Sequence, residues 1–403
     1  MLSVDDAKQK ILNDLIAVSE RESVRIESAL QRILFEDIDA SLDIPPYNNS
    51  AMDGYAYSQA SLTPSSQISL KIVGASYAGK PFTMPLNRNE CVRITTGAPL
   101  PEGTDSVVIQ EDVTVKDDCI VFTAPEHGGQ NIRFRGEEIT TGQPVFNKGR
   151  RLSAADLGLL ASLGYPSISI YRKIRVSVFA SGDELREPGV QLAAGEIYNS
   201  NRYSIMALLD RPAIDASYKG ILPDDPDVSA NLLRDAAATC DVIITTGGVS
   251  VGDKDFIVDV LQQHGVLNLW KIAMKPGKPL AFGRLNNAWF FGLPGNPVSA
   301  FITLLIIVMP GLRALSGESD ISHRQVLAKT TTPLKKKPGR TDYQRGILSC
   351  DEKGFLSVRG TGPQGSHRLS SLSDCNCLIA LPADTGDIRS GEYVSVIPLS
   401  ELL

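Results

Sequence analysis

The sequence predicts a multidomain α/β protein, with a parallel-sheet α/β domain, a helical N-terminal domain, an inserted β-rich domain and a C-terminal β-domain. Three observations predict this fold class. The chain has 403 residues, more than one hydrophobic core usually organises. Strand-like and helix-like segments alternate between residues 173 and 317, which is typical of a parallel sheet covered by helices. Short strand-like segments separated by Gly and Pro turns fill residues 43–140 and 318–403.

The N-terminal domain is predicted to be discontinuous. Residues 1–42 show apolar positions at helical spacing. Ser153 followed by Ala-Ala-Asp is typical of a helix start, and Gly164 is typical of the end of that helix. We expect this second helix to pack with the first segment. Residues 1–42 and 141–172 would then form one domain, and residues 43–140 would be inserted into it.

Composition limits the class of protein. A formal net charge of −6 gives no general attraction to nucleic acid or anionic membranes, so an anionic ligand requires a local group of cations. The six cysteines are scattered, which is typical of reduced thiols rather than a zinc site. The N-terminus lacks the basic and apolar parts of a secretory signal. The run AFITLLIIVM stops at Pro310 and is too short to span a bilayer. We therefore expect a cytoplasmic protein that binds neither nucleic acid nor a membrane.

The stretch DVIITTGGVSVGDKDF ends a predicted strand in two glycines, Gly247 and Gly248. Ligands of parallel sheets bind beyond such strand ends, at the point where the strand order switches. Bare backbone N–H groups at a helix start are typical of a phosphate site. The turn matches neither standard nucleotide-binding motif, and the same glycines are equally typical of a βα turn that needs positive φ.

Carboxylates follow three consecutive strands of the predicted sheet. They are Asp183 and Glu184, Asp224 and Asp225, and Asp253 and Asp255. Because these strand ends meet at one edge of the sheet, the acids predict a Mg²⁺ site, since this ion prefers carboxylate oxygen and bridges to phosphates. Any one of the pairs is also typical of a helix N-cap.

Cations and helix-start signals follow in KIAMKPGKPL and GLPGNPVSAF. Lys271, Lys275 and Lys278 surround a Pro-Gly turn, which favours anion binding, although any single lysine usually lies solvated at the surface. Pro294 and Pro297 bracket a turn that opens a helix with free N–H groups. The turn around Asp53 and the charged RFRGEE segment do not by themselves indicate a function, since each is also typical of a purely structural turn or edge strand.

Eight stretches of the chain, in order from about residue 30 to 400, resemble the MoeA/gephyrin E-domain family of molybdopterin molybdenumtransferases. The stretches are SAMDGYA, RITTGAPLPEGTDSVV, GGQNIRFRGEE, SGDEL, TTGGVSVGDKDF, KPGKPLAFG, GLPGNPVSA and QGSHRLSS. The resemblance implies an enzyme that inserts molybdate into adenylylated molybdopterin and releases AMP with Mg²⁺ as cofactor. It also implies an elongated homodimer of four-domain subunits, and as further partners the molybdopterin adenylyltransferase and molybdoenzyme acceptors.

The resemblance implies roles for individual residues. The expected catalytic residues are Asp53, Glu184, Asp255, Lys275 and Lys278. The expected substrate-binding residues are Thr96, Arg133, Glu138, Asp183, Gly247, Gly248, Ser250, Lys271, Pro279, Pro294, Pro297, Arg345 and Ser366. Within this set, the molybdate pocket is implied to comprise Lys275, Lys278, Pro279, Arg345 and Ser366. The expected metal ligands are Asp225 and Asp255.

Two alternatives stay open. The first is a non-catalytic molybdopterin-binding scaffold or degenerate paralogue, and the second is a tungstate-inserting homologue, because tungstate and molybdate have nearly equal size and charge. The chain departs from the family pattern at Asn48, Glu138 and Asn199. Asp53 and Arg133 belong to the inserted segment, whereas the metal and phosphate groups belong to the parallel sheet. We therefore expect each site to be shared between two protomers.

Overall fold

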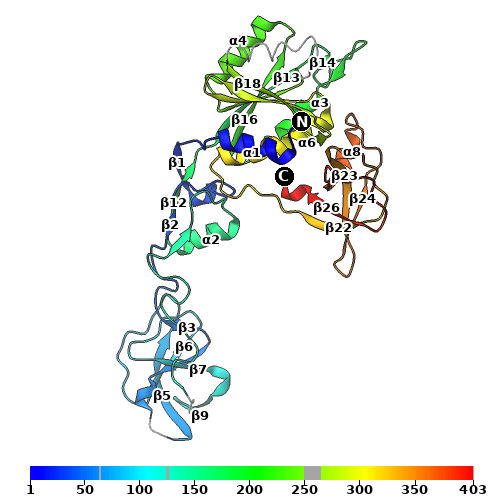
Figure 1. Cartoon of the computed structure of the whole chain (residues 1–403). Coiled ribbons are helices and arrows are strands. Elements are labelled where there is room, and N and C mark those ends of the chain that lie inside the picture. Colours follow the sequence, from blue (N-terminus) through cyan, green and yellow to red (C-terminus); the bar gives the residue numbers. More distant parts are fainter. Residues whose placement is uncertain (63–64, 124–126, 249–264, 403) are drawn as a thin grey trace.

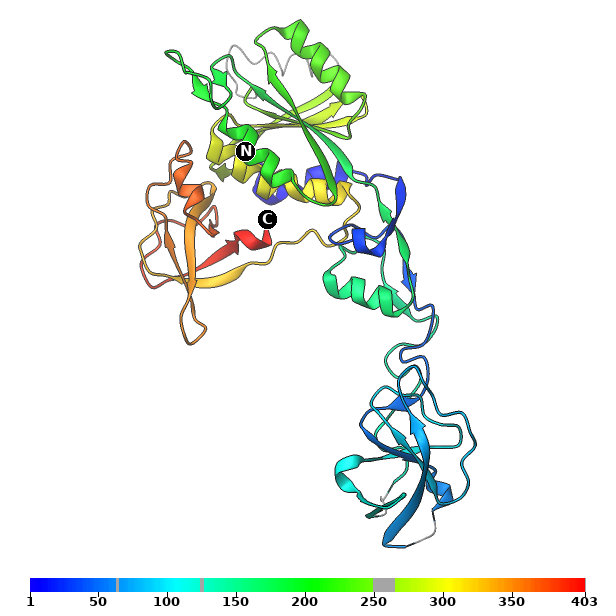
Figure 2. The same ribbon diagram turned by 180° about the vertical axis from the view of Figure 1, so that it is seen from behind.

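The computed structural model describes residues 1–62, 65–123, 127–248 and 265–402. It confirms the predicted fold class. Three units lie together, and the β-rich insertion stands away from them at the end of a narrow connection formed by two segments of chain (Figure 1). The view from behind shows the same separation (Figure 2). The domain boundaries drawn from the sequence stay predictions.

The first unit is less helical than its sequence pattern indicates. Its elements are β1 (Arg21–Arg25), η1 (Ile26–Ser28), β2 (Ile38–Asp39), β11 (Pro144–Phe146), α2 (Ala154–Ser162) and β12 (Ser167–Tyr171). The two segments join through antiparallel pairing of β1 with β12 and of β2 with β11. Helix α2 begins as predicted, because Ser153 and Asp156 form a reciprocal capping box, and Gly164 follows it with φ of 81°.

Helix α1 (Val4–Asp14) belongs to another core than its neighbours in sequence. Its buried residues, Val4, Ala7 and Ile11, pack into the core of the α/β unit. The helical pattern of residues 1–42 therefore holds for α1 alone, and the apolar stripe of this helix is buried against the sheet unit rather than against α2.

The inserted unit is a β-structure, as predicted. Its six-stranded sheet has the order β7-β4-β6-β5-β9-β8. The strands are β4 (Gly54–Tyr57), β5 (Gln67–Ser76), β6 (Glu90–Ile94), β7 (Ser106–Ile109), β8 (Thr114–Lys116) and β9 (Cys119–Thr123). The short pair β3 (Asn49–Ser50) and β10 (Ile132–Arg133) and the turns η2 (Gln59–Ser61) and η3 (Gln110–Asp112) complete it. Aromatic and aliphatic side chains such as Tyr57, Leu70 and Ile120 form its core.

The α/β unit is built on a six-stranded sheet of order β16-β13-β17-β21-β20-β18. The strands are β13 (Ile174–Ser181), β16 (Ile214–Leu222), β17 (Val242–Thr246), β18 (Gly265–Lys271), β20 (Pro279–Leu285) and β21 (Ala288–Leu293). The first four in the sheet are parallel. Strand β20 pairs antiparallel with both β21 and β18, which the alternation of strands and helices did not predict. A tight turn joins β20 to β21, and such a turn connects only antiparallel strands.

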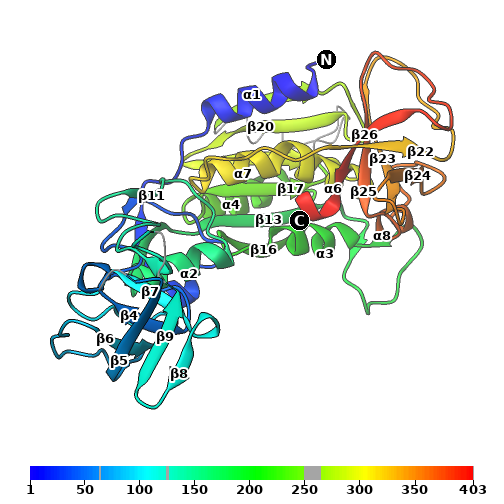
Figure 3. The ribbon, with the colours of Figure 1, turned by 90° about the horizontal axis from the view of Figure 1, so that it is seen from below.

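Helices cover both faces of this sheet. Helix α4 (Pro226–Ala237) covers one face, and α1, α3 (Ser200–Leu209), α6 (Pro297–Thr303) and α7 (Met309–Leu315) cover the other (Figures 1 and 3). Alternate residues of a strand supply the two cores: Ile244 packs on the α1 side and Ile243 on the α4 side. The helix expected after Asp253 lies outside the described residues.

The apolar run around residue 300 continues past Pro310, contrary to the expectation from sequence. Helices α6 and α7 are joined by the π-helical turn η4 (Leu304–Val308), in which Met309 N–H donates to the Leu304 carbonyl. The wider turn accommodates the proline, which lacks an N–H and crowds the preceding turn of a regular α-helix. Residues Pro297–Leu315 are apolar enough to span a bilayer, with mean hydropathy 2.1, but 83% of that segment is buried inside the protein. It is the central core helix of the unit.

The C-terminal unit is a small barrel. Its strands are β22 (Val326–Thr330), β23 (Thr341–Cys350), β24 (Leu356–Gly360), β25 (Cys377–Leu381) and β26 (Tyr393–Pro398). Because β23 pairs with both β24 and β25, the strands close into a ring. The helices α8 (Ser370–Ser373) and η5 (Leu399–Glu401) complete the unit. Strand β19 (Met274–Lys275) pairs with β23, which ties the barrel to the α/β unit. The small pair β14 (Leu185–Arg186) and β15 (Ile197–Tyr198) follows β13.

Candidate functional site

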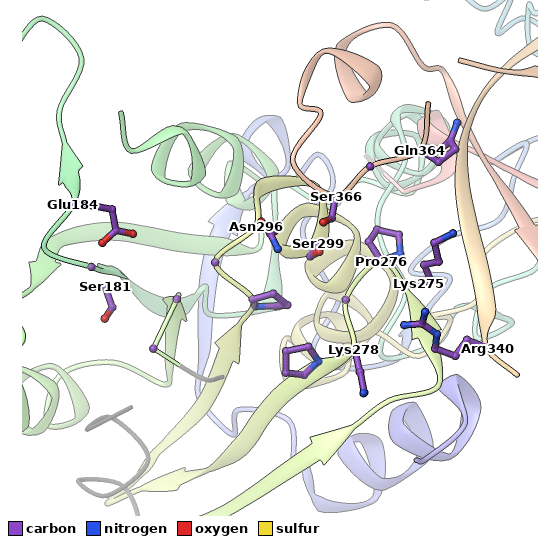
Figure 4. A pocket seen from close by; sticks show the side chains of 18 of the residues that line it. Ser181, Glu184, Lys275, Pro276, Lys278, Asn296, Ser299, Arg340, Gln364 and Ser366 are labelled. Atoms are coloured by element: carbon purple, nitrogen blue, oxygen red, sulfur yellow. The ribbon is translucent and has the colours of Figure 1, made fainter. Parts of the chain in front are cut away.

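A cavity of about 610 Å³, called the main cavity below, lies beyond the carboxyl ends of β13, β17 and β21. Strand β16 lies on one side of β13 in the sheet, and the next strand in the chain, β17, lies on the other side of β13. The strand order therefore switches at this point. The loop of Gln364 to Ser366 from the barrel forms the opposite wall. In Figure 4 the side chains of Lys275, Lys278 and Arg340 gather at one end, and Glu184 lies at the other.

The two glycines after β17 line the cavity with positive φ, 87° at Gly247 and 69° at Gly248. A side chain at Gly247 would meet the neighbouring strand, because its Cβ would lie 2.6 Å from the Ser181 carbonyl oxygen. Its N–H donates to the Leu293 carbonyl at 3.0 Å. A glycine is therefore required at position 247 because three strand ends pack closely there. Its N–H already donates within the protein, so it is not available to a phosphate.

The acids after the strands do not all face the cavity. Glu184 and Asp224 line it, whereas Asp183 and Asp225 do not. Asp225 caps α4, accepting hydrogen bonds from the N–H groups of Asp227 at 3.0 Å and Val228 at 3.1 Å. This is the capping role that its sequence position also predicted. Asp183 Oδ1 accepts the N–H of Asp224 at 3.4 Å.

Three of the residues named from the sequence, Ser250, Asp253 and Asp255, lie outside the described residues. Within the residues that the structure describes, no group of three or more His, Cys, Asp or Glu is placed to hold a metal ion. Glu184 and Asp224 nevertheless put hard carboxylate donors on the cavity wall, and donors of this type fit Mg²⁺.

The turn of residues 275–278, called the lysine turn below, packs closely against α6. Gly277 has φ of 101°, and a Cβ there would lie 2.3 Å from Thr303 Oγ1 on α6. Lys275 Nζ lies 3.4 Å from Asp342 Oδ2 on the barrel, and Asp342 is only 3% exposed. In the described part of the chain, the side chain of Lys278 has no hydrogen-bonding or ionic partner, and Lys278 lines the cavity together with Pro279. Lys271 is exposed and does not line it.

Arg345 lies behind the cavity wall rather than on it, and it is fully buried. Its Nε donates to Ser371 Oγ at 3.0 Å, its Nη2 donates to the Gly365 carbonyl at 3.2 Å, and Nη1 has no partner among the described residues. Burial lowers the pKa of this guanidinium, and the charges of Cys375 and Asp342 oppose that effect. The side chain therefore holds the loop that carries Ser366, which itself lines the cavity.

Four predicted residues lie on the inserted unit, away from the main cavity of the same chain: Asp53, Thr96, Arg133 and Glu138. Asp53 and Thr96 are in contact. Asp53 Oδ1 accepts the Thr96 N–H at 2.7 Å and its hydroxyl at 3.0 Å, and these hydrogen bonds lower the pKa of Asp53. Arg133 is exposed on β10, and Glu138 donates its backbone N–H to the Ile44 carbonyl.

The remaining predicted residues and the departures from the family pattern have local structural roles. Pro294 lines the cavity, whereas Pro297 begins α6 without lining it. Asn199 is buried and caps α3, accepting the Arg202 N–H at 3.1 Å. Asn48 Oδ1 accepts the Arg135 N–H at 2.8 Å.

Sequence reasoning missed Arg340 and Gln364, which both line the main cavity. Gln364 Oε1 accepts the Arg345 N–H at 2.8 Å, so it fixes the same loop. A signal for Arg340 was present, because it follows Pro338-Gly339 after three lysines, a pattern like that of KPGK.

Three family models match consecutive parts of the chain. The MoeA N-terminal region (domain I and II) matches residues 2–164, a probable molybdopterin binding domain matches residues 177–314, and the MoeA C-terminal region (domain IV) matches residues 328–399. The second of these ranges contains the lysine turn and the strand ends of the main cavity.

Full-length relatives agree with these matches. A Haemophilus influenzae protein named molybdopterin molybdenumtransferase is 42% identical over 407 residues, covering 100% of both chains. A Staphylococcus aureus protein of the same name is 30% identical over 400 residues, covering 98% of this chain and 95% of that one. The crystal structure of the molybdopterin biosynthesis MoeA protein of Pyrococcus horikoshii superposes with a TM-score of 0.85 at 27% identity, covering 99% of this chain and 100% of that chain. The chain therefore belongs to the MoeA family of molybdopterin molybdenumtransferases.

Proposed function

We propose that this protein acts in molybdenum cofactor biosynthesis as a molybdopterin molybdenumtransferase that inserts molybdate into adenylylated molybdopterin and releases AMP. The observation that carries the proposal is the division of the main cavity. Cations of the lysine turn and of the barrel stand at one end, and the strand-end acids and glycines stand at the other. A substrate with an anionic metal source and a phosphoanhydride needs both kinds of surface in one cavity.

The cationic end is proposed to hold the oxyanion. Lys278 and Arg340 have no partners within the described residues, so their charges are available to a ligand without breaking an existing ion pair. Asp342 orients Lys275 toward this end, and Arg345 positions the loop of Ser366 from behind. In the product, molybdenum is bonded to the two dithiolene sulfurs of the pterin.

The acidic end is proposed to hold the phosphoanhydride. Glu184 and Asp224, with Asp255 after the glycine turn, would hold Mg²⁺, which supplies neutralisation of the phosphate charge when bound. Asp225 is the weaker candidate for this role because one of its carboxylate oxygens caps α4. Hydrolysis of the anhydride by water leaves one phosphate on the pterin and the other on the departing AMP.

We also propose a cytoplasmic homodimer in which each site is shared. The distance between the inserted unit and the main cavity in one chain supports this arrangement, because Asp53 and Arg133 are otherwise far from any substrate bound there (Figures 1 and 2). A closed two-fold assembly makes two equivalent composite sites.

The test is incubation of the purified protein with adenylylated molybdopterin, Mg²⁺ and molybdate, followed by measurement of AMP and of molybdenum cofactor. We expect both products to appear only when molybdate is present. Tight binding of the pterin without release of AMP would favour the scaffold alternative. A parallel incubation with tungstate tests the second alternative, the tungstate-inserting homologue. Equal or faster turnover with tungstate would identify the protein as a tungstate-inserting enzyme.

A further inference from the structure

A second cavity, of about 680 Å³, lies beside the main cavity on the barrel, and it is called the outer pocket below. Its described lining includes five cations: Lys275, Lys335, Lys336, Lys337 and Arg340. Two carboxylates, Asp342 and Asp387, line it as well, which leaves an excess of three positive charges. This excess stands out in a chain whose formal net charge is −6.

The carboxylates do not neutralise the cations evenly. Asp342 pairs with Lys275 at 3.4 Å, and Asp387 pairs with Lys335 at 2.7 Å. The side chains of Lys337 and Arg340 have no partner in the part of the chain that the structure describes. Two positive charges therefore face this pocket without compensation.

Lys336 adds a buried ammonium group. It is 5% exposed, and among the described residues its Nζ donates only to carbonyl oxygens, those of Thr385 at 2.9 Å and of Lys337 and Ala383 at 3.5 Å. Burial lowers the pKa of this lysine, and the charges of Asp342 and Asp384 oppose that effect only in part. An anion in the pocket would add opposite charge near this ammonium group.

The two cavities share a wall. Lys275 and Arg340 line both of them, so the outer pocket adjoins the cationic end of the main cavity. Figure 4 shows these two side chains next to one another at that end.

We propose that the outer pocket is a second anion site that holds a small tetrahedral dianion beside the cationic end of the main cavity. This inference rests on the proposed function, because that function requires a tetrahedral oxyanion to reach the pterin. A phosphate group of the pterin substrate has a similar charge and shape, so the experiment tests both an oxyanion of the metal and inorganic phosphate.

The experiment is calorimetric titration of the full-length protein, without any pterin, with tungstate in place of molybdate and separately with inorganic phosphate. Wild-type protein is expected to bind tungstate at two sites per chain. The double variant Lys335→Gln/Lys337→Gln removes two cations and leaves the buried contacts of Lys336 intact, so it should weaken one site by about tenfold or more. The variant Lys278→Ala should weaken the other site instead, because Lys278 lines only the main cavity.

A matched control is Lys116→Gln/Lys353→Gln, which removes the same charge from exposed positions outside both cavities. It should leave both sites unchanged. Tighter binding of tungstate than of phosphate at the outer site assigns it to the oxyanion substrate, and the reverse assigns it to a phosphate group. A single site that responds to Lys278→Ala and ignores the first double variant refutes the outer site and leaves the proposed function standing. Absence of any tungstate site in wild-type protein refutes both.

Discussion

Lys275 Nζ lies 3.4 Å from Asp342 Oδ2, and this ion pair joins the lysine turn of the α/β unit to strand β23 of the barrel. Gln344 Nε2 also donates to Asp342 Oδ2, at 3.1 Å. The carboxylate is almost completely buried, while Lys275 remains partly open to the cavity. Two residues that are 67 positions apart in the chain, one from each unit, thus fix the position of one cation on the cavity wall.

Replacement of Asp342 by Asn should disturb oxyanion binding more than folding. The ammonium of Lys275 would lose the carboxylate partner that it has among the described residues, and this partly exposed pair is expected to contribute about 1 kcal/mol to the free energy of unfolding. We expect a weaker tungstate affinity by calorimetry and a small decrease in thermal stability. Glu27→Gln, which removes the exposed partner of Arg25, is the control and should change neither quantity. Unchanged tungstate binding in Asp342→Asn would show that the pair does not orient Lys275.

Gly277→Ala should disrupt the lysine turn. The new Cβ would lie 2.3 Å from Thr303 Oγ1 at a position with φ of 101°, so strain and overlap act together. We expect a destabilisation of about 2–4 kcal/mol and loss of tungstate binding. Gly354→Ala is the matched control, since Gly354 also has positive φ but no atom within 4 Å of the added group. A loss in Gly354→Ala as large as that in Gly277→Ala would show that backbone strain alone is responsible.

Arg345→Lys should uncouple the Ser366 loop from the barrel. A lysine ammonium cannot donate to both Ser371 Oγ and the Gly365 carbonyl in the geometry of the guanidinium. The expected cost is about 1–3 kcal/mol in the free energy of unfolding, together with weaker tungstate binding. The exposed Arg359 on β24 offers the control Arg359→Lys, for which both measurements should match wild type. Wild-type affinity in Arg345→Lys would contradict the positioning role.

His323 should make the α/β unit less stable in mild acid. Burial and the nearby charges of Lys8, Arg313 and Arg211 lower the pKa of this imidazole to about 4. The unfolded chain binds the proton more readily, so stability is fully present above about pH 6.5 and is lost as the pH falls from there toward 4. With allowance for partial exposure, we expect a loss of about 1–2 kcal/mol across this range.

The measurement is urea unfolding followed by tryptophan fluorescence, because both tryptophans, Trp270 and Trp289, lie on strands of the α/β unit. His323→Asn should reduce the fall in stability between pH 7 and pH 4.5, and the exposed His127→Asn should leave it unchanged. An identical pH dependence in His323→Asn and wild type would assign the fall to other groups.

Mixed dimers should test the shared site. Asp53→Asn protein and Asp255→Asn protein are expected to be inactive separately. If sites are shared, subunit exchange produces dimers with one doubly altered site and one intact site, so up to half of the wild-type activity per heterodimer should return. Proven exchange without recovered AMP release would show that each chain supplies its own site.

The sequence by itself determined the local elements and the family. The capping box at Ser153, the end of α2 at Gly164 and the start of α6 at Pro297 depend on residues within a few positions of each other, and each was predictable. The strand pairing at the edge of the α/β sheet was less predictable from the sequence. The reversed direction of β20 follows from the tight turn between β20 and β21, which the broad alternation of strands and helices does not reveal.

Only the tertiary structure decided which of the marked residues face one cavity. Neighbouring side chains in a turn point in different directions, so Glu184 and Asp224 line the main cavity, Asp183 does not, and Asp225 caps a helix. Arg345 resembles a ligand-binding cation in sequence but is buried behind the wall, and Arg340, which the sequence did not single out, lies on it. These outcomes depend on contacts between segments far apart in the chain, such as β19 with β23, and local residue preferences carry no record of such long-range packing.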